Sequence, residues 1–145
     1  GRIVEKDETE TGIRATLNFG HTLGHLIETH AGFGKYLHGE AVGLGIFFAS
    51  FVSWRCNELM EDEWIIINNF LIQILTPIQL PALDQNLFRE MILHDKKSQK
   101  NSVNFIMLKK LGKSFIKKET PVEMLWNEFK EFTKKFPEII KIEER

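Results

Sequence analysis

The sequence predicts a mainly α domain of about five or six helices with one small β-hairpin. Apolar residues recur at helical spacing in several stretches, and glycines and prolines separate these stretches. In residues 103–108, by contrast, Val103, Phe105 and Met107 fall on alternate positions, as in a strand. Strands and helices do not alternate along the chain, so we expect no parallel sheet.

The composition is that of an ordinary globular protein. With 145 residues, 43% of them hydrophobic and 27% charged, the chain is long enough to bury one core. A net charge of −1 predicts no binding to nucleic acid, and no apolar run is long enough to span a membrane. The single cysteine, Cys56, excludes an internal disulfide and fits a reducing, cytoplasmic compartment. The chain opens on Gly1 without a methionine, from which we expect a part of a longer protein.

The first half of the chain predicts helices. Residues 3–11 are acidic and indicate a short helix or turn, and residues 14–30 indicate a helix that ends before two glycines. A second, mostly apolar and buried helix is predicted from His38 or Gly39 to about Leu59. Residues 61–75 predict a third helix, because acidic residues fill its first turn.

The second half is less regular. Residues 76–82 contain two prolines and predict a connector, after which Asp84 or Asn86 caps a helix through residue 94. Residues 103–108 and 114–118 predict the two strands of the hairpin. Thr120 is predicted to cap a last helix, with Pro121 at its first position, that runs to about residue 136. The apolar stripe of that helix and other expected core residues are Leu125, Phe129, Phe132, Cys56 and the three tryptophans.

A polar stripe follows one face of the helix predicted over residues 14–30. Its members are spaced 4, 3, 4 and 3 residues apart, which places them on one side of an α-helix: Arg14, Asn18, His21, His25 and Glu28. Both imidazoles of His21 and His25 can reach one centre, and His38 follows a glycine-broken loop. Such a set is suited to Zn²⁺ or Fe²⁺. A histidine-rich surface helix explains the same spacing, so both interpretations stay open on the residues alone.

Two segments resemble a known family. "DETETGIRATLNFGHTLGHLIETHAGFGKYLHGEAVGLG", residues 7–45, resembles the 3-dehydroquinate synthase pattern DExExGxRxxLNxGHTxGHxxE followed by LHGExVxxG. "DKKSQKNSVNFIMLKKLGK", residues 95–113, is similar to a later segment of that family. The resemblance covers only the C-terminal helical domain of an enzyme usually more than twice this long. It therefore implies the C-terminal part of a dehydroquinate synthase-like fold, with the N-terminal NAD-binding domain outside residues 1–145.

The resemblance implies a site as well as a fold. The family converts 3-deoxy-D-arabino-heptulosonate 7-phosphate to 3-dehydroquinate and phosphate, with NAD and a divalent metal, zinc or else cobalt. His21 and His38 match two metal ligands, the third being a glutamate of the N-terminal domain, and His25 matches an acid/base histidine. The remaining matches are Glu10, Arg14 and Asn18 as active-site residues, and Arg14, Asn18, Lys96 and Lys97 as substrate-binding residues. We interpret His30, which lies off the stripe, as a bystander.

The resemblance also implies partners. We expect the missing NAD-binding domain and a phosphorylated sugar acid as partners, a homodimer for the full-length enzyme, and no activity for residues 1–145 alone. Alternatives are another sugar-phosphate cyclase, an enzyme like iron-type alcohol dehydrogenases, or a non-catalytic helical module. A phosphohydrolase of the HD type would need His94 and Asp95 to meet His21. One departure from the family pattern is Asn101, where glycine is usual; asparagine tolerates the left-handed backbone that glycine adopts.

Overall fold

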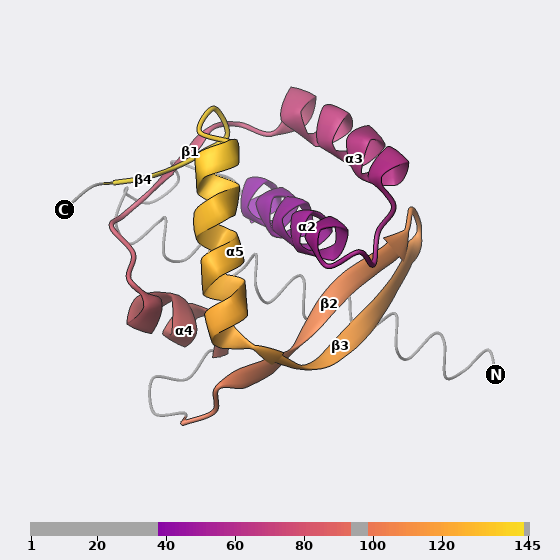
Figure 1. Cartoon of the computed structure of the whole chain (residues 1–145). Coiled ribbons are helices and arrows are strands. Elements are labelled where there is room, and N and C mark those ends of the chain that lie inside the picture. Colours follow the sequence, from indigo (N-terminus) through magenta and orange to yellow (C-terminus); the bar gives the residue numbers. More distant parts are fainter. Residues whose placement is uncertain (1–37, 94–98, 144–145) are drawn as a thin grey trace.

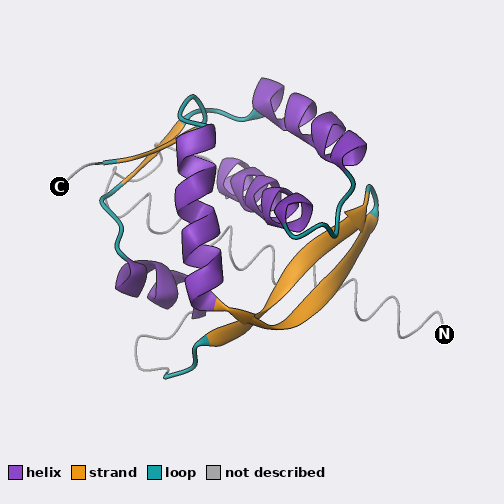
Figure 2. Ribbon diagram, in the orientation of Figure 1, coloured by secondary structure: helices purple, strands orange, loops and turns teal. Residues whose placement is uncertain are grey.

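The computed structural model describes residues 38–93 and 99–143, and Figure 1 shows how their elements are arranged. Helix α2 lies in the middle and contacts α3, α5 and strand β2. The described ranges contain four helices, one long hairpin and one short strand pair, and Figure 2 colours them by type. The mainly α fold with a small hairpin is therefore confirmed. The elements predicted over residues 3–11 and 14–30 lie outside the described residues.

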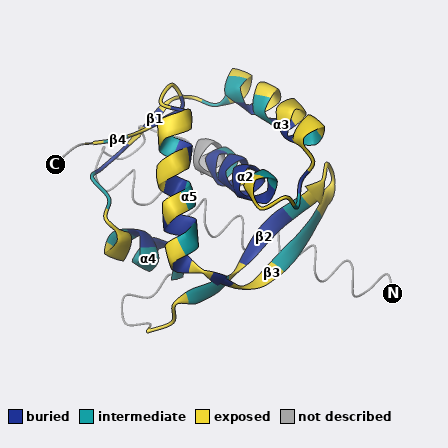
Figure 3. Ribbon diagram, viewed as in Figure 1, coloured by how far each residue is buried: buried dark blue, intermediate teal, exposed yellow. Residues whose placement is uncertain are grey.

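Helix α2 (His38–Arg55) forms the centre of the core. It begins at His38, as predicted, and Leu44, Phe47, Phe48, Phe51 and Val52 are buried almost completely, whereas Ile46 is exposed (Figure 3). The predicted end near Leu59 is wrong, because the helix stops at Arg55. Asn57 has a φ of 61°, and the Glu58 N–H donates to the Ser53 carbonyl oxygen at 2.9 Å. This left-handed Schellman ending satisfies the last carbonyls and turns the chain out of the helix.

Helix α3 (Glu61–Ile74) packs on α2. It has the predicted boundaries to within one residue, and Trp64, Ile67 and Leu71 bury one of its faces. The two helices approach closely at Gly43, where an added Cβ would lie 2.7 Å from Leu75 Cδ2. A larger residue at position 43 would therefore push the end of α3 away from α2, or force the Leu75 side chain to move.

The predicted connector after α3 contains a short strand. Strand β1 (Ile78–Leu80) pairs in parallel with β4 (Ile140–Ile142), so the expectation of no parallel pairing is wrong at this place. Each strand has three residues, and prolines at positions 77 and 81 flank β1. The pairing joins the end of the chain to the segment before α4 and packs Ile78, Leu80 and Ile140 into the core.

Helix α4 (Gln85–Leu93) starts after Asp84, which is the cap that the sequence predicts. The Leu87 N–H donates to Asp84 Oδ1 at 2.8 Å, and the Phe88 N–H donates to the Asp84 carbonyl oxygen at 3.0 Å. A side-chain oxygen that accepts from the third helical N–H is the usual N-cap arrangement. Phe88 then packs against Trp126 and Phe129 of the last helix.

The predicted hairpin is present and longer than expected. Strands β2 (Ser102–Lys110) and β3 (Lys113–Pro121) are antiparallel, and Lys110 pairs with Lys113 across a turn at Leu111 and Gly112. Gly112 has a φ of 80°, a conformation that costs glycine little. Asn101 directly precedes β2 and is not among the described residues with a positive φ. Position 101, where glycine is usual in the family, therefore needs no left-handed backbone in this chain.

Helix α5 (Val122–Lys135) follows β3 directly. The prediction that Thr120 caps it is wrong, because Pro121 is the N-cap residue and makes no side-chain cap. Thr120 instead belongs to the strand, is buried, and its hydroxyl donates to the Lys117 carbonyl oxygen at 2.8 Å. The predicted apolar stripe of α5 is confirmed, since Leu125, Phe129 and Phe132 are all fully buried.

Aromatic rings fill the space between α2, α3 and α5. Phe132 lies within about 5.5 Å, centroid to centroid, of Phe47, Phe48 and Phe51. Two of the three tryptophans, at positions 64 and 126, are buried, and Trp54 is half-buried, stacked on Trp64 at 5.2 Å. Cys56, in contrast, is exposed, so the prediction that it belongs to the core is wrong. Cys56 lies in the turn that directly follows α2. Because the apolar run of α2 leads up to this turn, the sequence pattern predicts that the helix continues through Cys56.

Candidate functional site

Most of the residues that the sequence predicts for the site lie outside the described part of the chain. These are Glu10, Arg14, Asn18, His21, His25, Lys96 and Lys97, together with His94 and Asp95 of the alternative phosphohydrolase reading. The structure describes the backbone of one candidate, His38, which is the first residue of α2. It therefore tests neither the predicted metal pair nor the contacts with substrate.

The helix that begins at His38 is firmly held. Its buried side chains pack against α3, α5 and β2, and the two buried hydroxyls of Ser50 and Ser53 are hydrogen-bonded. Ser53 Oγ donates to the Ala49 carbonyl oxygen at 2.7 Å and accepts the Leu108 N–H at 2.9 Å. This bond links α2 to the hairpin. His38 therefore begins a helix that the core holds from Leu44 onward.

The residues that follow Lys96 and Lys97 in the sequence are hydrogen-bonded to two helices. The segment 94–98 follows α4 directly, and residues 99–101 lead into β2. The guanidinium of Arg89, on α4, donates to the Lys100 carbonyl oxygen. The Val122 N–H of α5 donates to the Asn101 carbonyl oxygen at 2.9 Å. Both hydrogen bonds hold residues 100 and 101, which follow the two lysines in the sequence, and Lys96 and Lys97 themselves lie outside the described residues.

The far end of α2 carries charge but no catalytic arrangement. Arg55 Nε and Nη2 donate to the two carboxylate oxygens of Glu128, and this hydrogen bonding raises the pKa of Arg55. Partial burial, and then the nearby Glu128 carboxylate, raise the pKa of the Cys56 thiol. A cysteine with a raised pKa is a poor nucleophile at neutral pH. This end of the helix therefore carries a structural ion pair next to a thiol whose raised pKa weakens it as a nucleophile at neutral pH.

The part of the chain that the structure describes provides no complete set of side-chain ligands for a metal ion. Within residues 38–93 and 99–143, no three histidine, cysteine, aspartate or glutamate side chains gather around one point. Two imidazoles, from His21 and His38, are chemically suited to zinc, which also needs a third protein ligand in catalytic sites. The residues fit a metal site only if a further ligand joins them.

No helix among the described residues has the length and apolar character to cross a membrane.

Sequence comparison identifies the relatives. The family model described as 3-dehydroquinate synthase C-terminal matches residues 1–98. The chain is 40% identical over 110 residues to the 3-dehydroquinate synthase of Geobacter metallireducens, which covers 76% of this chain and 31% of that enzyme. It is 39% identical over 133 residues to that of Campylobacter curvus, which covers 89% of this chain and 38% of that enzyme. The chain thus spans about a third of the length of these relatives.

Solved structures share the fold. A 2-deoxy-scyllo-inosose synthase complexed with carbaglucose-6-phosphate, NAD⁺ and Co²⁺ aligns with a TM-score of 0.52 and 23% identity, over 76% of this chain and 32% of that chain. The 2-epi-5-epi-valiolone synthase ValA from Streptomyces hygroscopicus, with NAD⁺ and Zn²⁺ bound, aligns with a TM-score of 0.56 and 18% identity, over 81% and 32%. At these identities the likeness establishes the architecture alone. The family match over residues 1–98 and the curated relatives together show that the chain belongs to the 3-dehydroquinate synthase family and corresponds to its C-terminal domain.

Proposed function

We propose that the chain is the metal- and substrate-binding domain of a 3-dehydroquinate synthase, which converts 3-deoxy-D-arabino-heptulosonate 7-phosphate to 3-dehydroquinate and phosphate. The observation that carries this proposal is the family match over residues 1–98, because it spans the histidine-rich segment and continues into α2, α3 and α4. With one exposed cysteine and no disulfide among the described residues, the proposal extends to a reducing, cytoplasmic location.

The metal site of the proposal uses His21 and His38. Both are imidazole donors, and His38 is the first residue of α2, a helix that the core holds from Leu44 onward. The third ligand and the nicotinamide site belong to the preceding domain. When bound, the divalent metal and NAD supply Lewis-acid polarisation of substrate oxygens and a hydride acceptor that returns its hydride within one turnover. The two structural neighbours named above contain NAD⁺ with Co²⁺ or Zn²⁺, which supports these cofactors for the family.

The other candidate residues bind substrate and move protons. His25, one helical turn after His21 in the predicted helix, transfers a proton to or from the substrate. Arg14 and one of Lys96 and Lys97 bind the phosphate or carboxylate, since both ligand groups are anions that these cations pair with. Asn18 and Glu10 hold polar groups of the substrate in place.

The test is a chimaera in which residues 1–145 replace the matching third of the Geobacter metallireducens enzyme. With NAD and zinc, we expect phosphate release from 3-deoxy-D-arabino-heptulosonate 7-phosphate and formation of 3-dehydroquinate, and we expect neither from residues 1–145 alone. His38→Ala abolishes turnover, whereas the matched control His30→Ala retains it. Phosphate release with a different cyclised product would point to another sugar-phosphate cyclase. A folded chimaera that turns over no sugar phosphate would overturn the proposal.

A further inference from the structure

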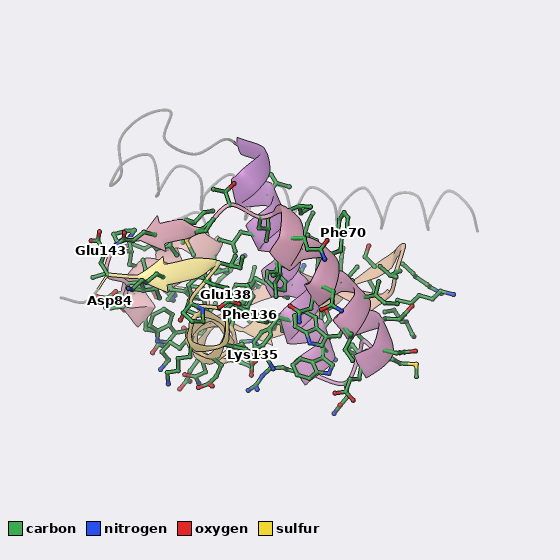
Figure 4. All side chains as sticks on the ribbon, turned by 90° about the horizontal axis from the view of Figure 1, so that it is seen from above. Phe70, Asp84, Lys135, Phe136, Glu138 and Glu143 are labelled. Atoms are coloured by element: carbon green, nitrogen blue, oxygen red, sulfur yellow. The ribbon has the colours of Figure 1, made fainter. Side chains whose placement is uncertain are left out.

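Helices α2 and α3 lie side by side and are in close contact at Gly43. Figure 1 shows the two helices next to each other, and Figure 4 shows them from above, with α2 passing behind the helix on which Phe70 is labelled. A Cβ built on Gly43 would lie 2.7 Å from Leu75 Cδ2. Carbon atoms in ordinary contact are about 3.5–4.0 Å apart, so this Cβ would be too close by about 0.8–1.3 Å. The contact therefore depends on the lack of a side chain at position 43.

Leu75 is held in place at both its backbone and its side chain. It is the C-cap residue of α3, and its N–H donates to the Leu71 carbonyl oxygen at 2.9 Å. Its side chain is half-buried and packs against the hydrophobic core. Rotation of this side chain makes room for one methyl group at position 43. A branched side chain there needs more room than the rotation provides, so it also displaces α2.

A displacement at position 43 reaches the start of α2. The buried part of the helix begins at Leu44, so the turns before it are free to tilt while the rest stays in the core. His38 precedes Gly43 by about 7.5 Å along the helix axis and by about 140° around it. A side chain that presses on Leu75 therefore moves the first turn of α2 toward the face that carries position 38.

A metal site does not tolerate a movement of this size. Binding groups must stay within about 0.5 Å of their productive positions, and an imidazole nitrogen binds zinc at about 2.0–2.1 Å. The overlap at position 43 is larger than that tolerance. Glycine also lowers the stability of a helix interior relative to alanine, a cost that is consistent with a need for close approach at this position.

We propose that Gly43 is a positioning residue for the metal ligand His38. The contact between Leu75 and the bare backbone of Gly43 sets the place of the first turn of α2, and with it the distance from His38 to the metal ion. This inference rests on the proposed function, which makes His38 a ligand and takes the third ligand from the preceding domain. Gly43 itself does not touch the metal ion or the substrate.

The zinc affinity of the chimaera described above tests the proposal, measured by competition with a chromophoric chelator. Gly43→Val should raise the zinc dissociation constant about tenfold or more, as loss of the groups that orient a ligand typically does. Gly43→Ala should raise it less, about threefold, because Leu75 makes room for one methyl group. Adding Leu75→Ala to Gly43→Val should restore the constant to within about threefold of the parent value, since it removes the atom that the new side chain meets.

Ala49→Val is the matched control for a general loss of stability. Ala49 is buried on the same helix about three turns after His38, so a larger residue there strains the core without displacing the first turn. With circular dichroism showing each variant folded, the zinc affinity of this control should equal that of the parent.

The possible outcomes separate this inference from the proposed function. Parent-like zinc affinity in Gly43→Val and Gly43→Ala would overturn the positioning role, and the metal site would still stand if His38→Ala loses zinc. An equal loss of affinity in Ala49→Val, or no recovery in the double variant, would also overturn it, because general strain would then explain the effect. A parent chimaera without zinc would overturn the proposed metal site and this inference together.

Discussion

Replacing Ser53 with alanine tests how α2 is joined to the hairpin. The Ser53 hydroxyl is fully buried and accepts the Leu108 N–H at 2.9 Å, so the substitution leaves this backbone donor without its partner. An unsatisfied buried donor costs about 1–3 kcal/mol, and the lower half of that range applies because Leu108 is only half-buried. Alanine returns up to about 0.5 kcal/mol through its higher helix propensity. The expected net loss in free energy of unfolding is about 1 kcal/mol.

Ser50 provides the matched control on the same helix. It is also fully buried, and its hydroxyl donates to the Ile46 carbonyl oxygen at 2.8 Å, but within the described part of the chain it makes no hydrogen bond to another element. Ser50→Ala should therefore be neutral or stabilise by about 0.5 kcal/mol, since back-bonding of this kind slightly destabilises helices. Urea denaturation, followed by tryptophan fluorescence, gives both values by linear extrapolation. Equal losses for the two variants would refute the argument that the bond between α2 and the hairpin carries the effect.

Three further predictions concern the core, a cap and the cysteine. Phe132→Ala should lower the free energy of unfolding by about 3–5 kcal/mol in urea denaturation, because the ring is fully buried among aromatic neighbours; a loss below 1 kcal/mol would contradict the packing. Asp84→Ala should cost about 1 kcal/mol by the same measurement and Asp84→Asn much less, since asparagine caps equally well, so equal losses would exclude a capping role. Cys56 should react with iodoacetamide at a more alkaline pH than free cysteine, because partial burial and the Glu128 carboxylate raise its pKa, and Glu128→Gln should lower the midpoint; an unshifted profile would disprove this.

Local patterns in the sequence predicted much of the described fold. The start of α2 at His38, the acidic start of α3, the Asp84 cap and the stripe of α5 each depend on neighbouring residues. The hairpin was also found, because alternation and a glycine turn are local signals. Each of these features depends on a few neighbouring residues, so a sequence pattern predicts it without knowledge of the contacts across the core.

Features that depend on distant contacts could not be predicted in the same way. Strands β1 and β4 have three residues each and lie about 60 positions apart, so no local pattern announces their pairing. The end of α2 depends on the left-handed Asn57, which a sequence pattern of apolar residues does not reveal. Thr120 looked like a cap, but the hairpin extends through it, and tertiary pairing overrode the local preference.

The candidate site rests on sequence more than on geometry. The spacing of the polar stripe is compatible with a metal site and with a histidine-rich surface helix, and only the family resemblance distinguishes metal ligands from other histidines. The structure adds that His38 is the first residue of the central helix α2, and that residues 100 and 101, after the two lysines, are hydrogen-bonded to α4 and α5. The family match supports the roles of the remaining residues without measuring them.

The zinc content of the purified chimaera tests the central claim most directly. We predict about one zinc ion per chain, measured by plasma mass spectrometry after exhaustive dialysis, because two imidazoles and the third ligand of the partner domain complete a catalytic site. His21→Ala and His38→Ala should each lose this zinc, His30→Ala should keep both zinc and activity, and His25→Ala should keep zinc but lose turnover. Full zinc occupancy in the His21→Ala or His38→Ala variant would contradict the account.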